Sequence, residues 1–163
     1  MNNGRIVVYA AILVATAGLL AASCGKKSGE SRDLGADGQV TALGTFEVTA
    51  RLVEIPDGAI FKRDLYNYAT ILKYQVLKVH RCELPADVVY VGHYNPWKPR
   101  AEAADQRVPN TGGDLRQFAA GQVHRMALDV QIDDHFMGGI INKYFGQDTG
   151  PLYWAAWTNL GSE

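Results

Sequence analysis

A mainly β domain is the fold class that the sequence predicts for residues 44–163, on three observations. Apolar and polar residues alternate with a period of two in five segments of this region, as they do in strands that bury one face. The segment that best fits a helix, residues 101–107, is short. The whole chain of 163 residues is 47% apolar and 10% aromatic, which provides for a packed core and excludes a disordered chain.

The first two strands are expected at residues 48–52 and 65–80. Apolar side chains occupy every second position of the first segment. The second segment begins in the same way, but adjacent Val76 and Leu77 interrupt its alternation. An interruption of this kind predicts a β-bulge, or a strand that passes from one sheet to another.

Three further strands are expected at residues 88–94, 126–132 and 152–158. The middle one alternates most regularly, and the last is rich in aromatic residues. Both patterns are typical of strands with at least one buried face.

Two connections flank the fourth expected strand. Residues 101–107 are good helix formers, preceded by Pro99 and ended by Pro109, and they predict a short helix between strands three and four. Residues 133–143 predict a second helical or irregular connection, in which the glycine pair 138–139 disfavours a regular helix.

Five strands with a helix between the third and the fourth resemble the order of an OB-type barrel. Residues 74–81, followed by residues 87–91, also resemble the netrin-like and metalloproteinase-inhibitor variety of that barrel, although Cys82 stands where that family usually has glycine. The disulfides of many extracellular members are absent, so the resemblance implies the barrel and not inhibitor activity. A β-sandwich or an α+β fold is the alternative.

The N-terminal 23 residues contain an apolar run with one charge in front of it. Arg5 precedes the run from Ile6 to Leu20, which is shorter than the roughly 20 residues of a membrane-spanning helix. Small residues then lead to Cys24, in a sequence that resembles the lipobox of bacterial lipoproteins. The resemblance implies that residues 1–23 are a signal peptide and that Cys24 is lipidated. An ordinary secretory signal or an uncleaved anchor is the alternative.

Lipid on Cys24 would hold the protein at a membrane. Several acyl chains, such as palmitate, bind a membrane stably where one binds it only marginally. In this family Gly25 after the cysteine implies the outer membrane, so the expected location is the bacterial cell envelope, lipid-anchored and facing the periplasm. Residues 24–43 are rich in glycine, serine and mixed charges, which predicts a flexible tether before the domain at 44–163.

Several kinds of chemistry have no support in the sequence. The 16 basic and 17 acidic residues give a net charge of −1, so no basic surface for nucleic acid is expected. The serines, at positions 23, 28, 31 and 162, lie outside the span from the first to the last expected strand, and neither GxGxxG nor GxxxxGK[ST] occurs. Cys82 is expected to be an unreactive turn thiol. No catalytic residue is assigned.

Histidines and aspartates form one candidate site for zinc or calcium. The histidines show no i, i+2 or i, i+4 pair, but residues at the ends of the third and fourth expected strands can meet if those strands are close. The candidate ligands are His93, His124, Asp133, Asp134 and His135. The alternative is that His124 is a hydrogen-bonded residue at the edge of the core and that the aspartate pair caps a connection.

Residues 92–100 and 135–146 are the candidate binding loops. The first crowds two prolines, two aromatic rings, an amide and two cations into nine residues, and the second contains glycines that permit a close approach. The candidate contact residues are His93, Tyr94, Asn95, Trp97, Lys98, Arg100, Asn142 and Lys143. The alternative is a structural Ω-loop, with Trp97 packed inward and Arg100 paired to a nearby carboxylate.

Two functions from different classes fit these features. The first is a membrane-tethered, non-catalytic binding or assembly module for a polysaccharide, peptidoglycan or protein partner, with no cofactor. The second is a small metal- or carboxylate-dependent envelope enzyme. The single small domain and the missing nucleophile favour the first function. Burial of Tyr94 and Trp97 would count against the first function as carried by the first loop, and separation of the histidines and aspartates by more than about 10 Å would exclude a shared metal site.

Overall fold

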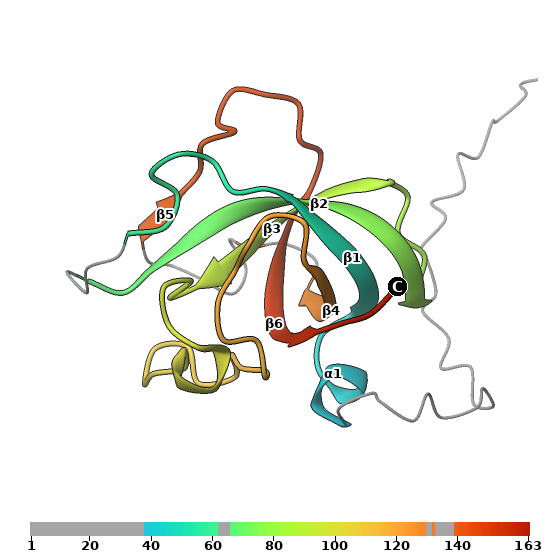
Figure 1. Ribbon diagram of the computed structural model, residues 1–163, viewed down its shortest axis with the longest axis horizontal. Helices are drawn as coiled ribbons and strands as arrows, with labels where there is room; N and C mark the ends of the chain where they lie inside the picture. The colour runs from blue at the N-terminus through green and yellow to red at the C-terminus, as the bar shows by residue number, and fades with distance from the viewer. Residues whose placement is uncertain (1–37, 62–65, 130–131, 133–138) are drawn as a thin grey trace, which may run out of the picture.

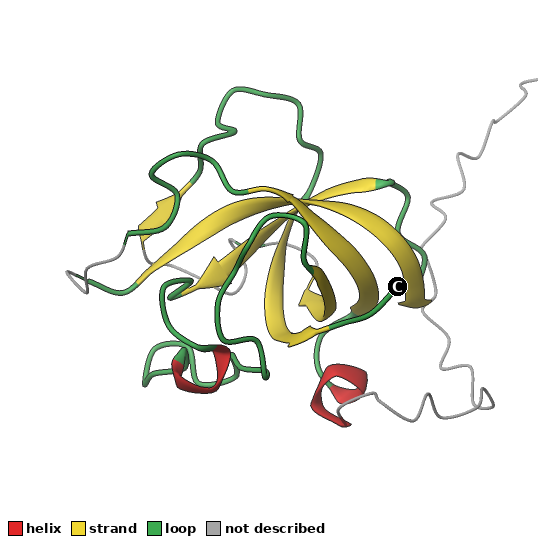
Figure 2. Cartoon of the chain, viewed as in Figure 1, coloured by secondary structure: helices red, strands yellow, loops and turns green. Residues whose placement is uncertain are grey.

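The computed structural model describes residues 38–61, 66–129, 132 and 139–163. Figures 1 and 2 show a strongly curved sheet with short helical turns beside it. In chain order its elements are α1 (Gly38–Ala42), β1 (Phe46–Glu54), β2 (Tyr68–Arg81), β3 (Val88–Tyr94), the 3-10 helix η1 (Arg100–Glu102), β4 (Val123–Asp129), β5 (Gly139–Ile141) and β6 (Leu152–Leu160).

The sheet closes on itself. Its strand order is β1-β4-β6-β3-β2-β5, and β1 also pairs with β2, so β1, β2, β3, β6 and β4 form a closed ring. β3 and β6 are parallel, and the other pairs of the ring are antiparallel. The predicted five-stranded barrel with a short helix between its third and fourth strands is confirmed. β5 is an additional short strand, parallel to the start of β2.

The predicted irregularity in the second strand is present. Ala50 of β1 is opposite Val76, and the preceding Thr49 is opposite Lys78, so Leu77 has no partner in the register. One strand thus carries an extra residue, which is the definition of a β-bulge, and such a residue increases the local twist. The bulge allows the long β2 to bend from β3 towards β1 and so helps to close the barrel.

Apolar side chains from all five barrel strands fill the interior. The buried residues of this cluster are Val48, Ala50, Leu52, Ala59, Leu72, Tyr74, Val89, Val91, Leu115, Phe118, Met126, Leu128, Tyr153 and Ala155. Leu115 and Phe118 come from the long connection between β3 and β4, which covers one end of the barrel. The barrel interior is therefore packed with side chains.

A second apolar cluster lies on the outer side of β2, β3 and β6. Val91 belongs to the interior cluster, so the next residue, Gly92, faces outward. A Cβ atom at Gly92 would be only 2.2 Å from the Cδ1 atom of Ile132. Ile132 thus packs directly on the strand backbone, together with Tyr144 and Trp154 of the same cluster. Part of the chain between β4 and β6 therefore covers this outer face.

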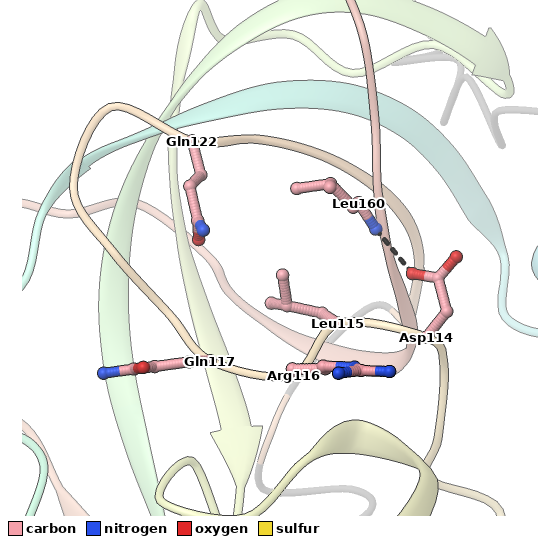
Figure 3. A pocket seen from close by; sticks show the side chains of 6 residues that line it. All are labelled: Asp114, Leu115, Arg116, Gln117, Gln122 and Leu160. Carbon is pink, nitrogen blue, oxygen red and sulfur yellow. Dashed lines mark hydrogen bonds between the residues drawn. The ribbon is translucent and has the colours of Figure 1, made fainter.

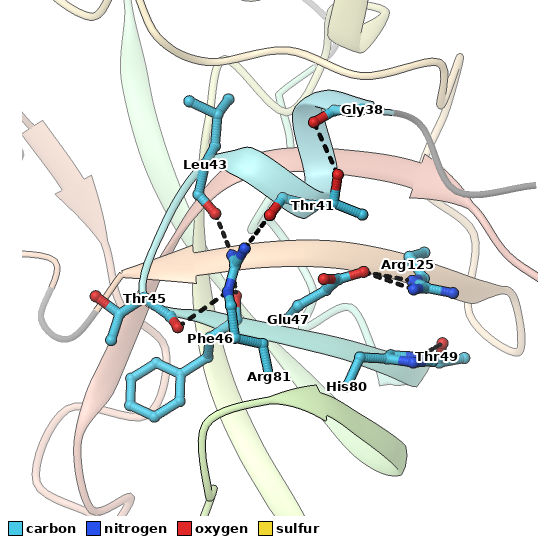
Figure 4. Close-up of polar contacts among 10 residues, drawn as sticks. All are labelled: Gly38, Thr41, Leu43, Thr45, Phe46, Glu47, Thr49, His80, Arg81 and Arg125. Atoms are coloured by element: carbon cyan, nitrogen blue, oxygen red, sulfur yellow. Dashed lines mark hydrogen bonds and ion pairs between the residues drawn. The ribbon is translucent and has the colours of Figure 1, made fainter. Parts of the chain in front are cut away.

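α1 lies within the segment that was expected to be a tether. Val40 of α1 is fully buried, and Arg81 at the end of β2 donates hydrogen bonds to the carbonyl oxygens of Thr41, Leu43 and Thr45 (Figure 4). These carbonyl oxygens lie in the last turn of α1 or just after it, where a helix provides no intrahelical hydrogen-bond donors. The folded unit therefore begins before residue 44, at least as early as residue 38.

Two polar pairs on the outer face of β1 join it to both neighbours. The Glu47 carboxylate binds the Arg125 guanidinium of β4, with Oε1 and Nη2 2.6 Å apart (Figure 4). Thr49 Oγ1 lies 2.8 Å from His80 Nε2 of β2. Both pairs are partly shielded from water, which strengthens them relative to exposed surface pairs.

The expected helix at residues 101–107 is wrong in length, because only the short η1 forms. Asp105 Oδ1 accepts hydrogen bonds from the backbone N–H groups of Arg107 and Val108. This side-chain bonding competes with the helical pattern and makes a turn instead. In the second connection, residues 133–138 lie outside the described residues, and β5 begins at Gly139. No helix of the described part of the chain has the length and hydropathy to span a membrane.

Candidate functional site

The first candidate binding loop faces the protein interior along most of its length. His93, Tyr94 and Asn95 are 0% exposed, and Arg100 is 2% exposed. Asn95 has a positive φ of 44°, which turns the chain sharply at the end of β3. These four side chains hold the loop in place, and they offer no surface to a large ligand.

Arg100 is the centre of this loop. Its Nη1 donates to the carbonyl oxygen of Tyr94 at 2.7 Å, and its Nη2 donates to the carbonyl oxygens of Asn95 and Lys98. The guanidinium carbon lies 5.1 Å from the ring centre of Phe118. Burial lowers the pKa of Arg100 to about 10, so the side chain stays charged at neutral pH. Backbone carbonyls thus surround the cation, instead of the carboxylate that the Ω-loop interpretation expected.

Asp105 has other partners. It accepts hydrogen bonds from the Tyr94 hydroxyl and from the Asn67 amide, each at 2.6 Å. Burial, followed by the Asp105 bond, raises the pKa of Tyr94 to about 12. Trp97 and Lys98 are half-buried, and Lys98 Nζ lies 4.7 Å from the Trp97 ring centre. Among the aromatic and cationic side chains of the first candidate loop, only Trp97 and Lys98 are partly open to solvent.

The structure brings His93 and His124 together around Tyr74. The Tyr74 hydroxyl lies 3.0 Å from His93 Nε2 and 3.1 Å from His124 Nδ1. His124 Nε2 lies 3.2 Å from Gln122 Oε1, which also accepts the Ala119 N–H at 2.9 Å. Tyr74, His93 and His124 are all fully buried inside the barrel.

The Ala119 contact fixes the direction of this hydrogen-bond chain. A backbone N–H needs an acceptor, so the oxygen of the Gln122 amide faces inward. His124 Nε2 must then donate to that oxygen, and its neutral Nδ1 accepts the Tyr74 O–H. The Tyr74 oxygen in turn accepts from His93 Nε2, which leaves His93 Nδ1 as a buried acceptor without a hydrogen-bond partner in the described structure.

Burial keeps both histidines neutral. It lowers the pKa of His124 to about 4, and it lowers the pKa of His93 well below the usual value, with the Arg100 charge adding to the shift. The expected convergence of the two histidines is therefore real, but their ring nitrogens bond to Tyr74. No group of three metal-ligating side chains occurs among the described residues. Asp133, Asp134 and His135 lie outside them.

The second pair of candidate contacts lies beside the β1–β2 loop. Lys143 is exposed, and its Nζ is 3.7 Å from the position that a Cβ of Gly58 would take. Asn142 is half-buried, and its Oδ1 accepts the backbone N–H of Tyr144 at 2.9 Å, which shapes its own turn. Lys143 therefore faces a loop that the sequence reasoning did not consider.

Exposed aromatic side chains occur in the same two loops as Gly58 and Lys143. Phe145 is 90% exposed, Tyr66 is 55% exposed and Phe61 is 40% exposed. Phe61 and Tyr66 both pack edge-on against Tyr68, at centroid distances of 5.4 and 5.8 Å, and Tyr68 pairs with the first residue of β5. We call Phe61, Tyr66, Lys143 and Phe145 the loop-end surface. Its three rings stand in predicted loops or at strand ends, where alternation gives no signal of exposure.

Cys82 is disulfide-bonded in the structure, which differs from the expected free thiol. Its φ is 58°, in the left-handed region that favours glycine. That conformation is strained for a residue with a Cβ atom. The sequence contains one other cysteine, Cys24, which lies outside the described residues.

Comparison with known proteins gives no match. No protein-family model matches the chain, and neither a curated protein nor a solved structure matches it. No relative therefore lends an activity or a ligand to this chain.

Proposed function

We propose that the protein is a membrane-tethered, non-catalytic binding module of the bacterial cell envelope. Its loop-end surface would bind an envelope polysaccharide. The observation that carries this proposal is the exposure of three aromatic rings, at 90%, 55% and 40%, in the β1–β2 loop and in the connection between β5 and β6, on a barrel with a packed interior. Large contiguous apolar patches on a protein surface mark interaction sites, whereas single exposed apolar residues are ordinary.

The chemistry of the loop-end surface suits a sugar chain. Flat rings offer apolar faces to the C–H side of a pyranose, and Lys143 and Tyr66 offer hydrogen-bond donors to its hydroxyl groups. OB-type barrels as a class bind oligosaccharides and oligonucleotides with the loops after their first and fourth strands. The loop-end surface stands on the equivalent loops here, which is an analogy of fold only. The charge balance of 16 basic and 17 acidic residues favours a sugar over a nucleic acid.

The enzyme alternative has weaker support. General acid–base work requires titratable groups that a substrate can reach. His93 and His124 are 0% exposed, and each has a nitrogen bonded to Tyr74. The two histidines therefore fit a structural role better than a catalytic one.

Replacement of Phe145 or Tyr66 by alanine should weaken binding to isolated peptidoglycan sacculi roughly ten-fold, since a ring contact contributes about 0.5–1.5 kcal/mol beyond its buried area. Co-sedimentation of the full-length protein in mild detergent would measure this change. Leu77→Ala is the matched control, because Leu77 is an exposed apolar residue at 39% on the distal half of β2. If the wild type does not sediment with sacculi, or if Leu77→Ala weakens sedimentation equally, the proposed surface is wrong.

The membrane tether is the second part of the proposal, and it makes a distinct prediction about Cys24. The mature protein from a Gram-negative host should partition into the membrane and show a mass increase from acyl chains on Cys24. Cys24→Ser should abolish the acyl mass and release the protein from the membrane. A wild-type mass without lipid would contradict lipidation.

A further inference from the structure

A second surface site lies at the opposite end of β6 from the loop-end surface. Phe145 precedes the start of β6 at Leu152, and Leu160 ends that strand. Beside Leu160 is an open pocket of about 370 Å³ (Figure 3), a volume within the usual range for small-ligand sites. Its lining residues are Asp114, Leu115, Arg116, Gln117, Gln122 and Leu160.

The Gln122 amide presents its donors to this pocket. Its Oε1 already accepts the Ala119 N–H and bonds His124 Nε2, so the amide cannot turn its oxygen outward without losing both bonds. The Nε2 group therefore carries its two N–H donors on the pocket side. The buried hydrogen-bond chain through His124 and Tyr74 holds this orientation from behind.

Two charged side chains complete the set of polar groups. Arg116 is exposed, and its guanidinium has no hydrogen-bond or ion-pair partner among the described residues. Asp114 is held in place, because its Oδ1 accepts the backbone N–H of Leu160 at 2.7 Å (Figure 3). Its other oxygen remains available as an acceptor. The pocket thus combines two donor groups, from Arg116 and Gln122, with one fixed acceptor, from Asp114.

Leu115 and Leu160 supply the apolar part of the pocket. Leu160 is 59% exposed, one of the most exposed large apolar residues of the described chain. A ligand that satisfies all these groups has a carboxylate for Arg116 and Gln122, an N–H donor for Asp114, and a small aliphatic group for the two leucines. The C-terminal residue of a peptide carries these three features together.

We propose that this pocket binds the free carboxyl terminus of a peptide that ends in a small aliphatic residue. The site does not depend on the loop-end surface or on its ligand. The probe is acetyl-Ala-Ala with a free carboxylate, and acetyl-Ala-Ala-amide is its neutral counterpart. Isothermal titration calorimetry with the full-length protein in mild detergent should show binding of the acid and at least ten-fold weaker binding of the amide.

Variants of two lining residues test the assigned contacts. Gln122→Glu keeps an acceptor for Ala119 and His124 but replaces the outward N–H donors with a negative charge, so binding of the acid should fall by at least ten-fold while circular dichroism stays unchanged. Arg116→Gln should weaken binding by a similar factor, and Arg107→Gln, an exposed arginine elsewhere, should leave it unchanged. No measurable binding of the acid, equal binding of acid and amide, or full binding by Arg116→Gln and Gln122→Glu would each overturn the proposal.

Discussion

Replacement of Arg100 by alanine should destabilise the protein by about 3–5 kcal/mol, the range for losing one member of a buried polar arrangement together with its packing. The carbonyl oxygens of Tyr94, Asn95 and Lys98 would lose a charged donor, and the face of Phe118 would lose the planar group beside it. The expected result is a lower midpoint of urea unfolding, measured by tryptophan fluorescence, because the loop that covers the barrel end would lose its central anchor.

Two further variants separate the planar fork of Arg100 from its charge. Arg100→Lys keeps the charge but cannot direct donors to three carbonyls at fixed angles, so it should recover less than half of the lost stability. Arg107→Ala removes an exposed arginine from the same connection and should change stability by less than about 0.5 kcal/mol. Equal stability of Arg100→Ala and Arg107→Ala would show that the buried guanidinium does not anchor the loop.

The strands could be predicted from the sequence because a strand with one buried face imposes a period of two. The alternation also located the bulge at Leu77, since an extra residue shifts the phase of every residue after it. The length of the helix could not be predicted in this way. Good helix formers follow Pro99, but the carboxylate of Asp105 takes backbone N–H groups and ends the helix early.

The candidate site was harder to predict, because burial of polar residues depends on contacts between distant strands. The sequence suggested that His93 and His124 could meet, and they do. Their common partner, Tyr74, is 19 residues from one and 50 from the other, and it lies in an apolar stripe that gave no sign of a polar role. Arg100 resembled a surface cation, although a sharp turn at Asn95 directs three carbonyls towards it.

The loop-end surface could not be predicted for the opposite reason, because its apolar residues are exposed. Phe61, Tyr66 and Phe145 are large apolar residues, which sequence reasoning assigns to the core by default. They stand in the β1–β2 loop and in the connection between β5 and β6, and Lys143 of that connection approaches Gly58 of the β1–β2 loop, a long-range contact that no local pattern encodes. A surface that takes residues from two separated loops is visible only after the barrel has closed.

The buried histidines should make the protein sensitive to mild acid. The folded-state pKa of His124 is about 4, and that of His93 is also lowered, whereas an unfolded histidine titrates near 6.5. Between these values the unfolded chain binds more protons than the folded one. The stabilisation is therefore complete above about pH 6.5 and is lost as the pH falls from 6.5 towards 4. For His124 alone the free energy of unfolding should decrease by about 2 kcal/mol between pH 7 and pH 5.

Urea unfolding of the wild type and of two histidine variants at pH 7, 6 and 5 would measure this decrease, in a range where most carboxylates stay ionised. His124→Gln keeps an amide oxygen that can accept the Tyr74 O–H but cannot titrate, so it should be less stable at pH 7 and should lose about 2 kcal/mol less on acidification. His80→Gln, at a half-buried histidine on the outer face of β2, is the comparison variant outside the barrel interior. If the wild type is as stable at pH 5 as at pH 7, the barrel interior does not hold its histidines in the neutral form.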